Sequence, residues 1–451
     1  MAVTTKTALR LIVSIFLVLL SDHFAGGVAR AGLKGACAKV DITPPLGITL
    51  IGSQGKPSDA IMDELYAKAM VLSDGPNTIA IVSADLLYTP IEEITGPVRI
   101  AIHEQLAIPA QNIMVCATHT HSGPEIFTRS KLPREGRLDA ARIDQAYLQV
   151  LVRKMADSVS IACRNMQDVR IGAAMGRLPE VLYNRRPTTP EGRATMMFTL
   201  PPEVAATQRI ETTREGDTRV AFTLPAPQGP LTFGPIDPAV FALRMETADG
   251  KLVGSLVGFG CHPVCIYPHL STTISADYPA FATRVVEKAE GGISLFALGL
   301  AGNAVPLQRG ARPCEQIGKA LGGEAVKRLQ LVPTTGDVSL KAISREITLP
   351  VRTTSSSDDS VSTEIQVVKL GNTCIVGLPG EVLVEVGLAI KRRASVENLF
   401  IVTLANDAVG YVCHRQAYEE GGYEPESGTH LAKGAGEVMI EQALALINEV
   451  K

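Results

Sequence analysis

The sequence predicts a mixed α/β fold, with mixed sheets flanked by helices and an active site at the carboxyl ends of strands. Apolar runs typical of strands alternate with runs of helical spacing along the 451 residues. Five of the apolar runs also end in a small group of polar residues. Hydrophobic residues make up 46% of the chain and charged residues 20%, which supplies a packed core and excludes a disordered chain.

The elements of the first half follow in a clear order. Residues 66–72 and 78–83 are strand-like, flank a turn at 73–77 and predict a hairpin. Helical spacing over 91–106 predicts a helix, and 113–117 a short strand. Residues 144–166 predict a long amphipathic helix.

Two later stretches lack periodicity. Residues 184–238 are rich in Pro, Thr and charge, and a loop of this length is usually functional, so it is a candidate lid. The Ser/Asp cluster within 352–363 suggests a boundary between two lobes.

The N-terminus has the pattern of an export signal. Lys6 and Arg10 precede the apolar run 11–20, which is too short to cross a bilayer core of about 30 Å. Small residues follow, and Ala29-Arg30-Ala31 fits a cleavage site. We therefore expect residues 1–31 to be a signal peptide, cleaved near Ala31, and the mature protein to be secreted or periplasmic. An uncleaved membrane anchor is the alternative.

The charge balance argues against a nucleic-acid partner. The net charge is −3, from 43 basic and 46 acidic residues, whereas a nucleic-acid binder needs a concentrated basic face. The absence of Trp and the 4% aromatic content disfavour base stacking. These observations favour an enzyme that acts on a small or lipidic molecule, or a protein that binds one. They do not decide whether the protein contacts a membrane surface.

The polar groups that follow the apolar runs supply the candidate site. They comprise Thr118–Pro124, His262-Pro263, Gly302-Asn303, Pro379–Glu381 and Asn406–Tyr411. In open α/β sheets, ligands bind at the carboxyl ends of strands, so we expect these five groups to lie together.

Four of these side chains are of the types that bind catalytic zinc: His119, His121, His262 and Glu381. Their spacing is weakly specific, because H-x-H occurs by chance. From the spacing alone, histidines hydrogen-bonded at strand ends are the favoured interpretation. Glu381 can also be explained as an acid that complements a helix dipole.

A longer series of short motifs runs in order from about residue 36 to 430. It includes AKVDITPPLG at 38–47, LYAKA at 65–69, IVSAD at 81–85, ATHTHSGP at 117–124, Asn184-Arg185, GPIDP at 234–238, Cys261-His262-Pro263, SADY at 275–278, LPGE at 378–381, residues 406–411 and GYE at 422–424. This series resembles the neutral/alkaline ceramidase family, of which ATHTHSGP is the most distinctive signature.

The resemblance implies a neutral ceramidase N-terminal-type hydrolase domain over residues 32–451. It implies a zinc-dependent amidohydrolase, in which a zinc-activated water cleaves the N-acyl amide bond of ceramide or a related compound. The implied zinc ligands are His119, His262, Glu381 and Tyr411.

The same resemblance implies substrate-handling and catalytic roles for His121, Arg185 and Tyr423. His121 can move a proton, Tyr423 can donate to the developing negative charge, and Arg185 can hold a polar or anionic part of the substrate. Asp277 is expected to orient a ligand histidine. From the residues alone, Tyr411 and Tyr423 are equally well explained as half-buried packing residues.

The chain departs from the family in three respects. One is Glu125, which follows ATHTHSGP where the family has a glycine. Val305 stands where characterised ceramidases have a serine once considered a nucleophile, which excludes a serine mechanism there. The resemblance also does not extend to the C-terminal immunoglobulin-like domain of ceramidases proper.

Three alternatives therefore remain: a non-catalytic secreted lipid- or glycan-binding protein, a zinc esterase, and a cysteine nucleophile at Cys116 or Cys261. The sequence leaves the substrate, the disulfide pattern and the oligomeric state open.

Overall fold

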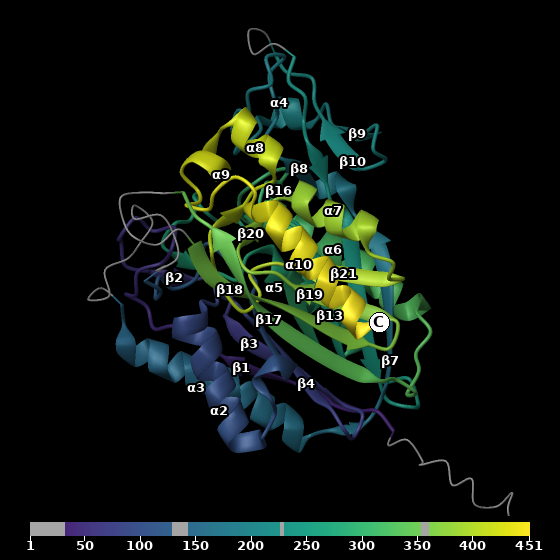
Figure 1. Cartoon of the computed structure of the whole chain (residues 1–451). Coiled ribbons are helices and arrows are strands. Elements are labelled where there is room, and N and C mark those ends of the chain that lie inside the picture. The colour runs from purple at the N-terminus through teal and green to yellow at the C-terminus, as the bar shows by residue number, and fades with distance from the viewer. Residues whose placement is uncertain (1–31, 129–142, 226–229, 353–359) are drawn as a thin grey trace, which may run out of the picture. The chain divides into compact units, whose positions relative to one another are not determined.

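Three main sheets build the part of the protein that the computed structural model describes, which is residues 32–128, 143–225, 230–352 and 360–451 (Figure 1). Each sheet combines antiparallel strands with one parallel pair at an edge. The predicted mixed α/β fold is confirmed. The predicted signal peptide, residues 1–31, lies outside the described residues.

The first sheet, called the β1 sheet, has the strand order β5-β4-β3-β1-β6. Its strands are β1 (Lys34–Asp41), β3 (Tyr66–Ser73), β4 (Thr78–Ala84), β5 (Ile113–Ala117) and β6 (Gln167–Asp168). The predicted hairpin is the antiparallel pair β3 and β4. The predicted helices are a π-helical turn (Ile91–Thr95) that continues into α2 (Gly96–Leu106), and α3 (Gln145–Arg164). The 3₁₀ turn η2 (Ala110–Asn112) leads into β5.

The second sheet, called the β13 sheet, has the order β15-β13-β12-β7, and only β13 and β15 are parallel. Its strands are β7 (Arg170–Arg177), β12 (Ala239–Glu246), β13 (Leu252–Phe259) and β15 (Ile293–Leu298). Two helices pack against it, α5 (Tyr278–Glu290) and α6 (Ala311–Leu331). The Asp277 carboxylate accepts a hydrogen bond from the Tyr278 amide, which caps the start of α5.

The third sheet, called the β19 sheet, has the order β17-β18-β19-β21. Its strands are β17 (Leu340–Pro350), β18 (Ser360–Leu370), β19 (Thr373–Gly377) and β21 (Asn398–Val402). Helix α10 (Ala435–Val450) runs across this sheet, with α7 (Val384–Arg393) beside it (Figure 1). The suggested boundary at 352–363 falls largely on residues 353–359, outside the described residues. The strands on either side pair with each other from Pro350 and Ser360 onward.

The inner faces of the three sheets share one apolar core. It contains Met70, Ile81, Met114, Phe241, Leu243, Leu256, Leu295, Ile375, Phe400 and Val402. Phe241 of the β13 sheet stacks on Phe400 of the β19 sheet, with ring centroids 4.8 Å apart. Gly258 lies under Phe400, and a Cβ there would be 2.1 Å from that ring. The helices cover the outer faces, so the core fixes how the three sets of strand ends meet.

Short elements complete the described structure. Three two-stranded pairs are β2 (Ala60–Ile61) with β14 (Thr273–Ile274), β8 (Leu182–Asn184) with β16 (Ala304–Pro306), and β20 (Glu381–Val382) with β22 (Tyr411–Val412). The candidate lid contains α4 (Pro202–Ala205) and a sheet of β9 (Arg209–Thr212), β10 (Thr218–Ala221) and β11 (Pro235–Ile236). The 3₁₀ turn η5 (Pro179–Val181), α8 (Arg415–Glu420) and α9 (Tyr423–Glu426) are the remaining helices.

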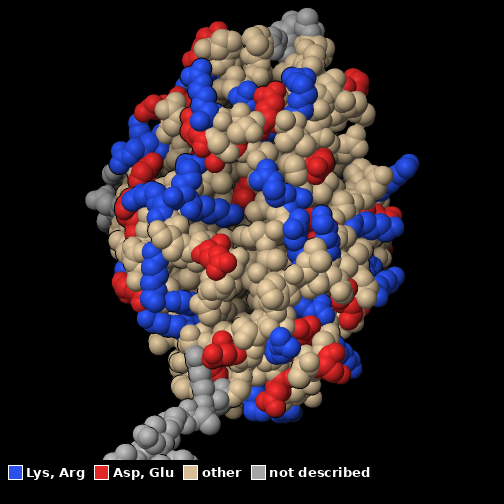
Figure 2. Space-filling model, turned by 90° about the vertical axis from the view of Figure 1, so that its right-hand side faces the viewer, with Lys and Arg blue, Asp and Glu red and all other residues tan. Residues whose placement is uncertain are grey.

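The described surface mixes both signs of charge. On the face shown in Figure 2, lysines and arginines alternate with acidic side chains. Among the described residues, no helix is both long and apolar enough to cross a bilayer.

Candidate active site

The parallel pairs of the three sheets bring their carboxyl ends to one place. His119 follows β5, His262 follows β13, and Glu381 lies in β20, just after β19. The His119 backbone has φ +71°, a left-handed conformation that is uncommon for a residue other than glycine and that clusters at functional sites. The three side chains are at most 5% exposed. Side chains from three of the five predicted strand-end groups therefore converge here.

His119 and His262 face each other through their Nε2 atoms, which are 3.0 Å apart. Each ring donates its Nδ1 proton to a backbone carbonyl, that of Leu87 at 2.9 Å and that of Ala301 at 2.7 Å. This bonding leaves a lone pair on each neutral ring's Nε2. Burial and the neighbouring His119 lower the pKa of His262 to about 4, so His262 is neutral at pH 7.

Glu381 completes this group. Its Oε2 lies 3.3 Å from the Nε2 of each histidine. That oxygen is buried and accepts no hydrogen bond from a described residue. Its other oxygen, Oε1, accepts a hydrogen bond from the Tyr88 hydroxyl at 2.7 Å. Burial opposes ionisation, but the two neighbouring imidazoles hold the pKa of Glu381 well below its usual range.

This arrangement fits a metal ion. Two nitrogen lone pairs and one carboxylate oxygen converge with no described hydrogen-bond donor between them, so a positive charge is needed at their centre. The nitrogens of His121 belong to the same group, since ligand atoms of His119, His121 and His262 all lie within 4.8 Å of one another. His119 and His262 are thus the fixed pair, and Glu381 and His121 offer further ligand atoms.

Tyr411 is held beside Glu381 by the parallel pairing of β20 with β22. Its hydroxyl accepts a hydrogen bond from Arg185 Nη2 at 3.0 Å. Burial, reinforced by the charge of Glu381, raises the pKa of Tyr411 well above its usual range. Tyr411 therefore presents a neutral phenol whose oxygen is oriented by a cation.

Arg185 is buried and already engaged by the protein. Its Nε donates to Glu424 at 2.8 Å, and its Nη2 donates to the Gly302 carbonyl as well as to Tyr411. Glu424 also binds Arg186, at 2.7 Å. Burial disfavours the charge on Arg185, but Tyr411 and Glu424 raise its pKa above the ordinary value. These bonds make Arg185 a positioning residue for Tyr411.

His121 and Tyr423 lie at the edges of the group. The His121 ring stacks on Tyr267, with centroids 5.7 Å apart, and its Nε2 is buried without a hydrogen bond from any described residue. Burial and the neighbouring His119 and His262 lower the pKa of His121 well below 6.5. Tyr423 is 42% exposed, with its ring 5.6 Å from that of Tyr411. It therefore lies on the solvent side of the group.

The structure changes the expected roles of Arg185, which the protein itself engages, and of Asp277, and it adds two residues. Asp277 does not orient a ligand histidine, because its oxygens accept from the Ile266 and Tyr278 amides while backbone carbonyls orient both rings. Tyr88 and Glu424 were missed. Tyr88 follows β4 as His119 follows β5, so the end of one more apolar run would have indicated it. Glu424 gave no signal beyond its place next to Tyr423.

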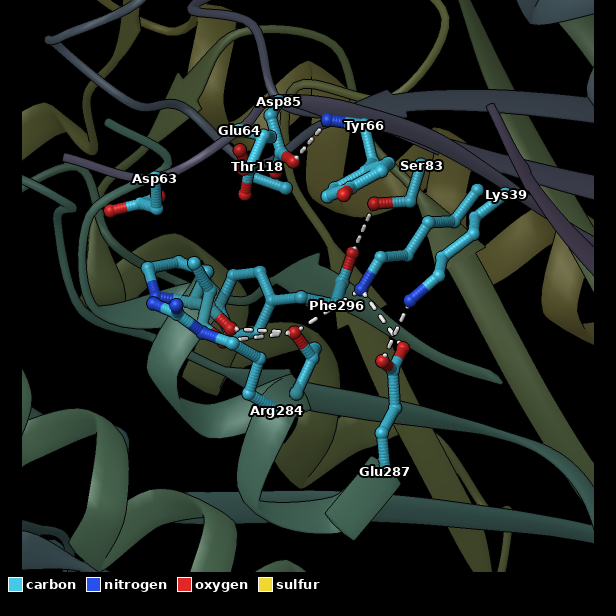
Figure 3. Close-up of a pocket in the computed structure, with 14 residues that line it drawn as sticks. Lys39, Asp63, Glu64, Tyr66, Ser83, Asp85, Thr118, Arg284, Glu287 and Phe296 are labelled. Atoms are coloured by element: carbon cyan, nitrogen blue, oxygen red, sulfur yellow. Dashed lines mark hydrogen bonds and ion pairs between the residues drawn. The ribbon is translucent and has the colours of Figure 1, made fainter. Parts of the chain in front are cut away.

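A pocket lies between the β1 sheet and α5 (Figure 3). Several of its charged side chains have partners in the protein: Glu287 accepts from Lys39 at 2.9 Å and from Lys68 at 3.4 Å, and Asp85 accepts from the Tyr66 amide. Its cavity of about 100 Å³ is too small for an acyl chain, and none of the site side chains described above lines it. The candidate active site is therefore the histidine group.

Comparison with known proteins identifies the fold. No family model matches the sequence. The structure matches that of neutral ceramidase from Pseudomonas aeruginosa with a TM-score of 0.72 and 18% sequence identity, over 93% of this chain and 75% of that one. It also matches a ceramidase complexed with C2, with a TM-score of 0.69 and 17% identity, over 93% of this chain and 76% of that one. The protein therefore has the neutral ceramidase fold.

Proposed function

We propose that the protein is an exported zinc-dependent hydrolase that cleaves N-acyl amide bonds. The observation that carries the proposal is the convergence of His119 Nε2, His262 Nε2 and Glu381 Oε2 at separations of 3.0 to 3.3 Å. Ligand atoms on a tetrahedral zinc with bonds of about 2.0–2.1 Å lie roughly 3.3–3.4 Å from one another. The three atoms are thus spaced as zinc ligands, and the ceramidase fold of the chain supports the same reading.

The proposed ligands are His119, His262, Glu381 and Tyr411. When bound, zinc would polarise the amide carbonyl and lower the pKa of a water molecule towards about 7. The backbone carbonyls of Leu87 and Ala301 hold the two imidazoles in the tautomer that a metal ligand needs. Arg185 orients the Tyr411 oxygen from the other side.

The remaining residues supply proton transfer and charge stabilisation. His121 has a neutral ring and an unengaged Nε2, so it can accept the proton of the attacking water and return it to the leaving nitrogen. Tyr423, at the solvent side, can donate its hydroxyl proton to the oxyanion as negative charge develops on the carbonyl oxygen. Because burial and Glu381 raise the pKa of Tyr423, the phenol keeps that proton at neutral pH.

The test combines metal analysis with catalysis. Purified mature protein is expected to hold about one zinc per chain, as in a catalytic site with open coordination. Chelation is expected to abolish hydrolysis of N-acyl amides, and zinc to restore it. His119→Ala and Glu381→Gln are expected to lose both the metal and the activity. His103→Ala, which lies on α2 and belongs neither to the histidine group nor to the pocket beside α5, is the matched control that should retain both.

Three results would redirect the proposal. A faster reaction with a matched ester than with the amide would favour the esterase. Bound zinc without turnover of any amide or ester would favour a binding protein. Activity that resists chelation but not thiol alkylation would favour a cysteine nucleophile. Export is tested separately, by determining whether the mature N-terminus lies near residue 32.

A further inference from the structure

Arg309 carries a buried guanidinium that the protein itself does not satisfy. The residue lies between β16 and α6 and is only 9% exposed. Its Nε, Nη1 and Nη2 are all buried, and no described residue accepts a hydrogen bond from any of them. One face of the guanidinium lies on the ring of Phe198, with Cζ 3.3 Å from the ring centroid. Five N–H donors are therefore held in a fixed plane without an acceptor.

Two other buried arginines near the candidate active site, unlike Arg309, have a carboxylate partner. Arg185 and Arg186 are also buried, but Glu424 binds both, at 2.8 and 2.7 Å. Among the described residues, no carboxylate forms an ion pair with Arg309. Burial lowers the pKa of Arg309 to about 10, so the side chain is still a cation at neutral pH. A buried cation without a counter-ion is strongly unfavourable, which makes it a candidate for completion by an anionic ligand.

Arg309 belongs to the neighbourhood of the candidate active site. Phe198 contacts Tyr267, with ring centroids 6.5 Å apart, and Tyr267 in turn stacks on His121. The positive charge of Arg309 also contributes to lowering the pKa of His121. The residue follows Val305 in the segment where the sequence departs from the ceramidase pattern. Phe198 is only partly buried, so its ring is the part of this packing that can move to admit a ligand.

We propose that Arg309 binds a carboxylate of the substrate, so that the preferred substrates are N-acyl amides with an anionic head group, such as N-acyl amino acids, rather than ceramide. This inference rests on the proposed amidase function. The planar fork of a guanidinium matches a carboxylate through two parallel hydrogen bonds. One guanidinium also matches one negative charge, which favours a carboxylate over a phosphate dianion.

The test uses two probes that differ only in charge, N-octanoylglycine and its neutral analogue N-octanoylglycinamide. Zinc-loaded wild type is compared with Arg309→Met, which keeps most of the side-chain volume, and with Arg312→Met, an exposed arginine at the start of α6. Arg309→Met is expected to lower kcat/KM for the anionic probe by about 10- to 100-fold and to leave that for the neutral probe within about threefold. Arg312→Met is expected to leave both values unchanged.

A second measurement does not depend on turnover. N-octanoylglycine is expected to raise the Tm of the wild type and of Arg312→Met but not that of Arg309→Met, because a ligand stabilises only the protein that binds it. Without ligand, the Tm of Arg309→Met is expected to equal or exceed that of the wild type, since the substitution removes an uncompensated buried charge.

The outcomes separate the two proposals. If the wild type hydrolyses both probes and Arg309→Met leaves their kcat/KM ratio unchanged, the inference is wrong while the amidase function stands. A lower Tm of ligand-free Arg309→Met with an unchanged ratio would make Arg309 a packing residue. If no variant hydrolyses either probe, the amidase function loses support. The Tm response then decides on Arg309: selective stabilisation of the wild type supports carboxylate binding, and equal stabilisation overturns it.

Discussion

Tyr88→Phe tests whether Glu381 is a metal ligand that depends on its hydrogen-bond partner. The substitution removes one oxygen, the one that donates to Glu381 Oε1 at 2.7 Å. This bond fixes the carboxylate with Oε2 facing His119 and His262. Without it, Glu381 can rotate away from the two Nε2 atoms, and Oε1 remains buried without that donor.

The expected loss follows from the kind of bond. A hydrogen bond to a charged group contributes about 1.5–3 kcal/mol, and loss of a residue that orients a metal ligand typically lowers metal affinity 10- to 100-fold. We therefore expect Tyr88→Phe to weaken zinc binding by about 10- to 100-fold, which is about 1.4–2.7 kcal/mol. The affinity is measured by competition with a chromogenic zinc chelator.

The matched control is Tyr147→Phe. The Tyr147 hydroxyl donates to the Ile42 carbonyl, in a contact that involves none of the site residues. Both variants lose one hydrogen bond. The expected loss of unfolding free energy is about 1 kcal/mol for Tyr147→Phe and about 1.5–3 kcal/mol for Tyr88→Phe, but only Tyr88→Phe is expected to lose zinc affinity. If Tyr88→Phe bound zinc as tightly as the wild type, the assignment of Glu381 as a ligand oriented by Tyr88 would be refuted.

Three further predictions concern buried charge and packing. Burial raises the pKa of Asp85 from 3.8 to about 6, so its protonated form is favoured in the folded state and its charged form destabilises the fold above about pH 6. The free energy of unfolding of Asp85→Asn, measured in urea, should therefore exceed that of the wild type at pH 8. The difference should shrink as the pH falls through 6 towards 4, and a difference that does not depend on pH would contradict this. Glu424→Gln removes the carboxylate that pairs with Arg185. We therefore expect a loss of about 3–5 kcal/mol of unfolding free energy together with a lower kcat. An unchanged urea midpoint would show that this ion pair is not needed for stability. Gly258→Ala places a Cβ 2.1 Å from the Phe400 ring, and we expect about 1–3 kcal/mol of destabilisation in the same assay; full stability would mean that Phe400 has room to move.

Much of the fold could be predicted because its signals are local. The hairpin of β3 and β4, the strand β5 and the helices α2 and α3 follow from the periodicity of apolar residues and from turn and cap residues next to them. The polar groups at the strand ends were also readable, because a buried strand that ends at a site passes directly from apolar to polar side chains. Pairing between strands that are distant in sequence, such as β7 with β12, leaves no comparable local signal.

The sequence by itself determined which side chains were available at the strand ends, including His119, His262 and Glu381. Only the tertiary structure decided which of them meet and in what state. His119 and His262 are 143 residues apart, and their Nε2 atoms face each other because carbonyls of two other loops hold their Nδ1 protons. The sequence indicated Arg185 as the residue that binds an anionic group of the substrate. In the folded protein Arg185 pairs with Glu424, whereas Arg309 has no partner among the described residues. Ionic partners act over a few ångströms of space whatever their separation along the chain, so charge compensation is a property of the folded molecule alone.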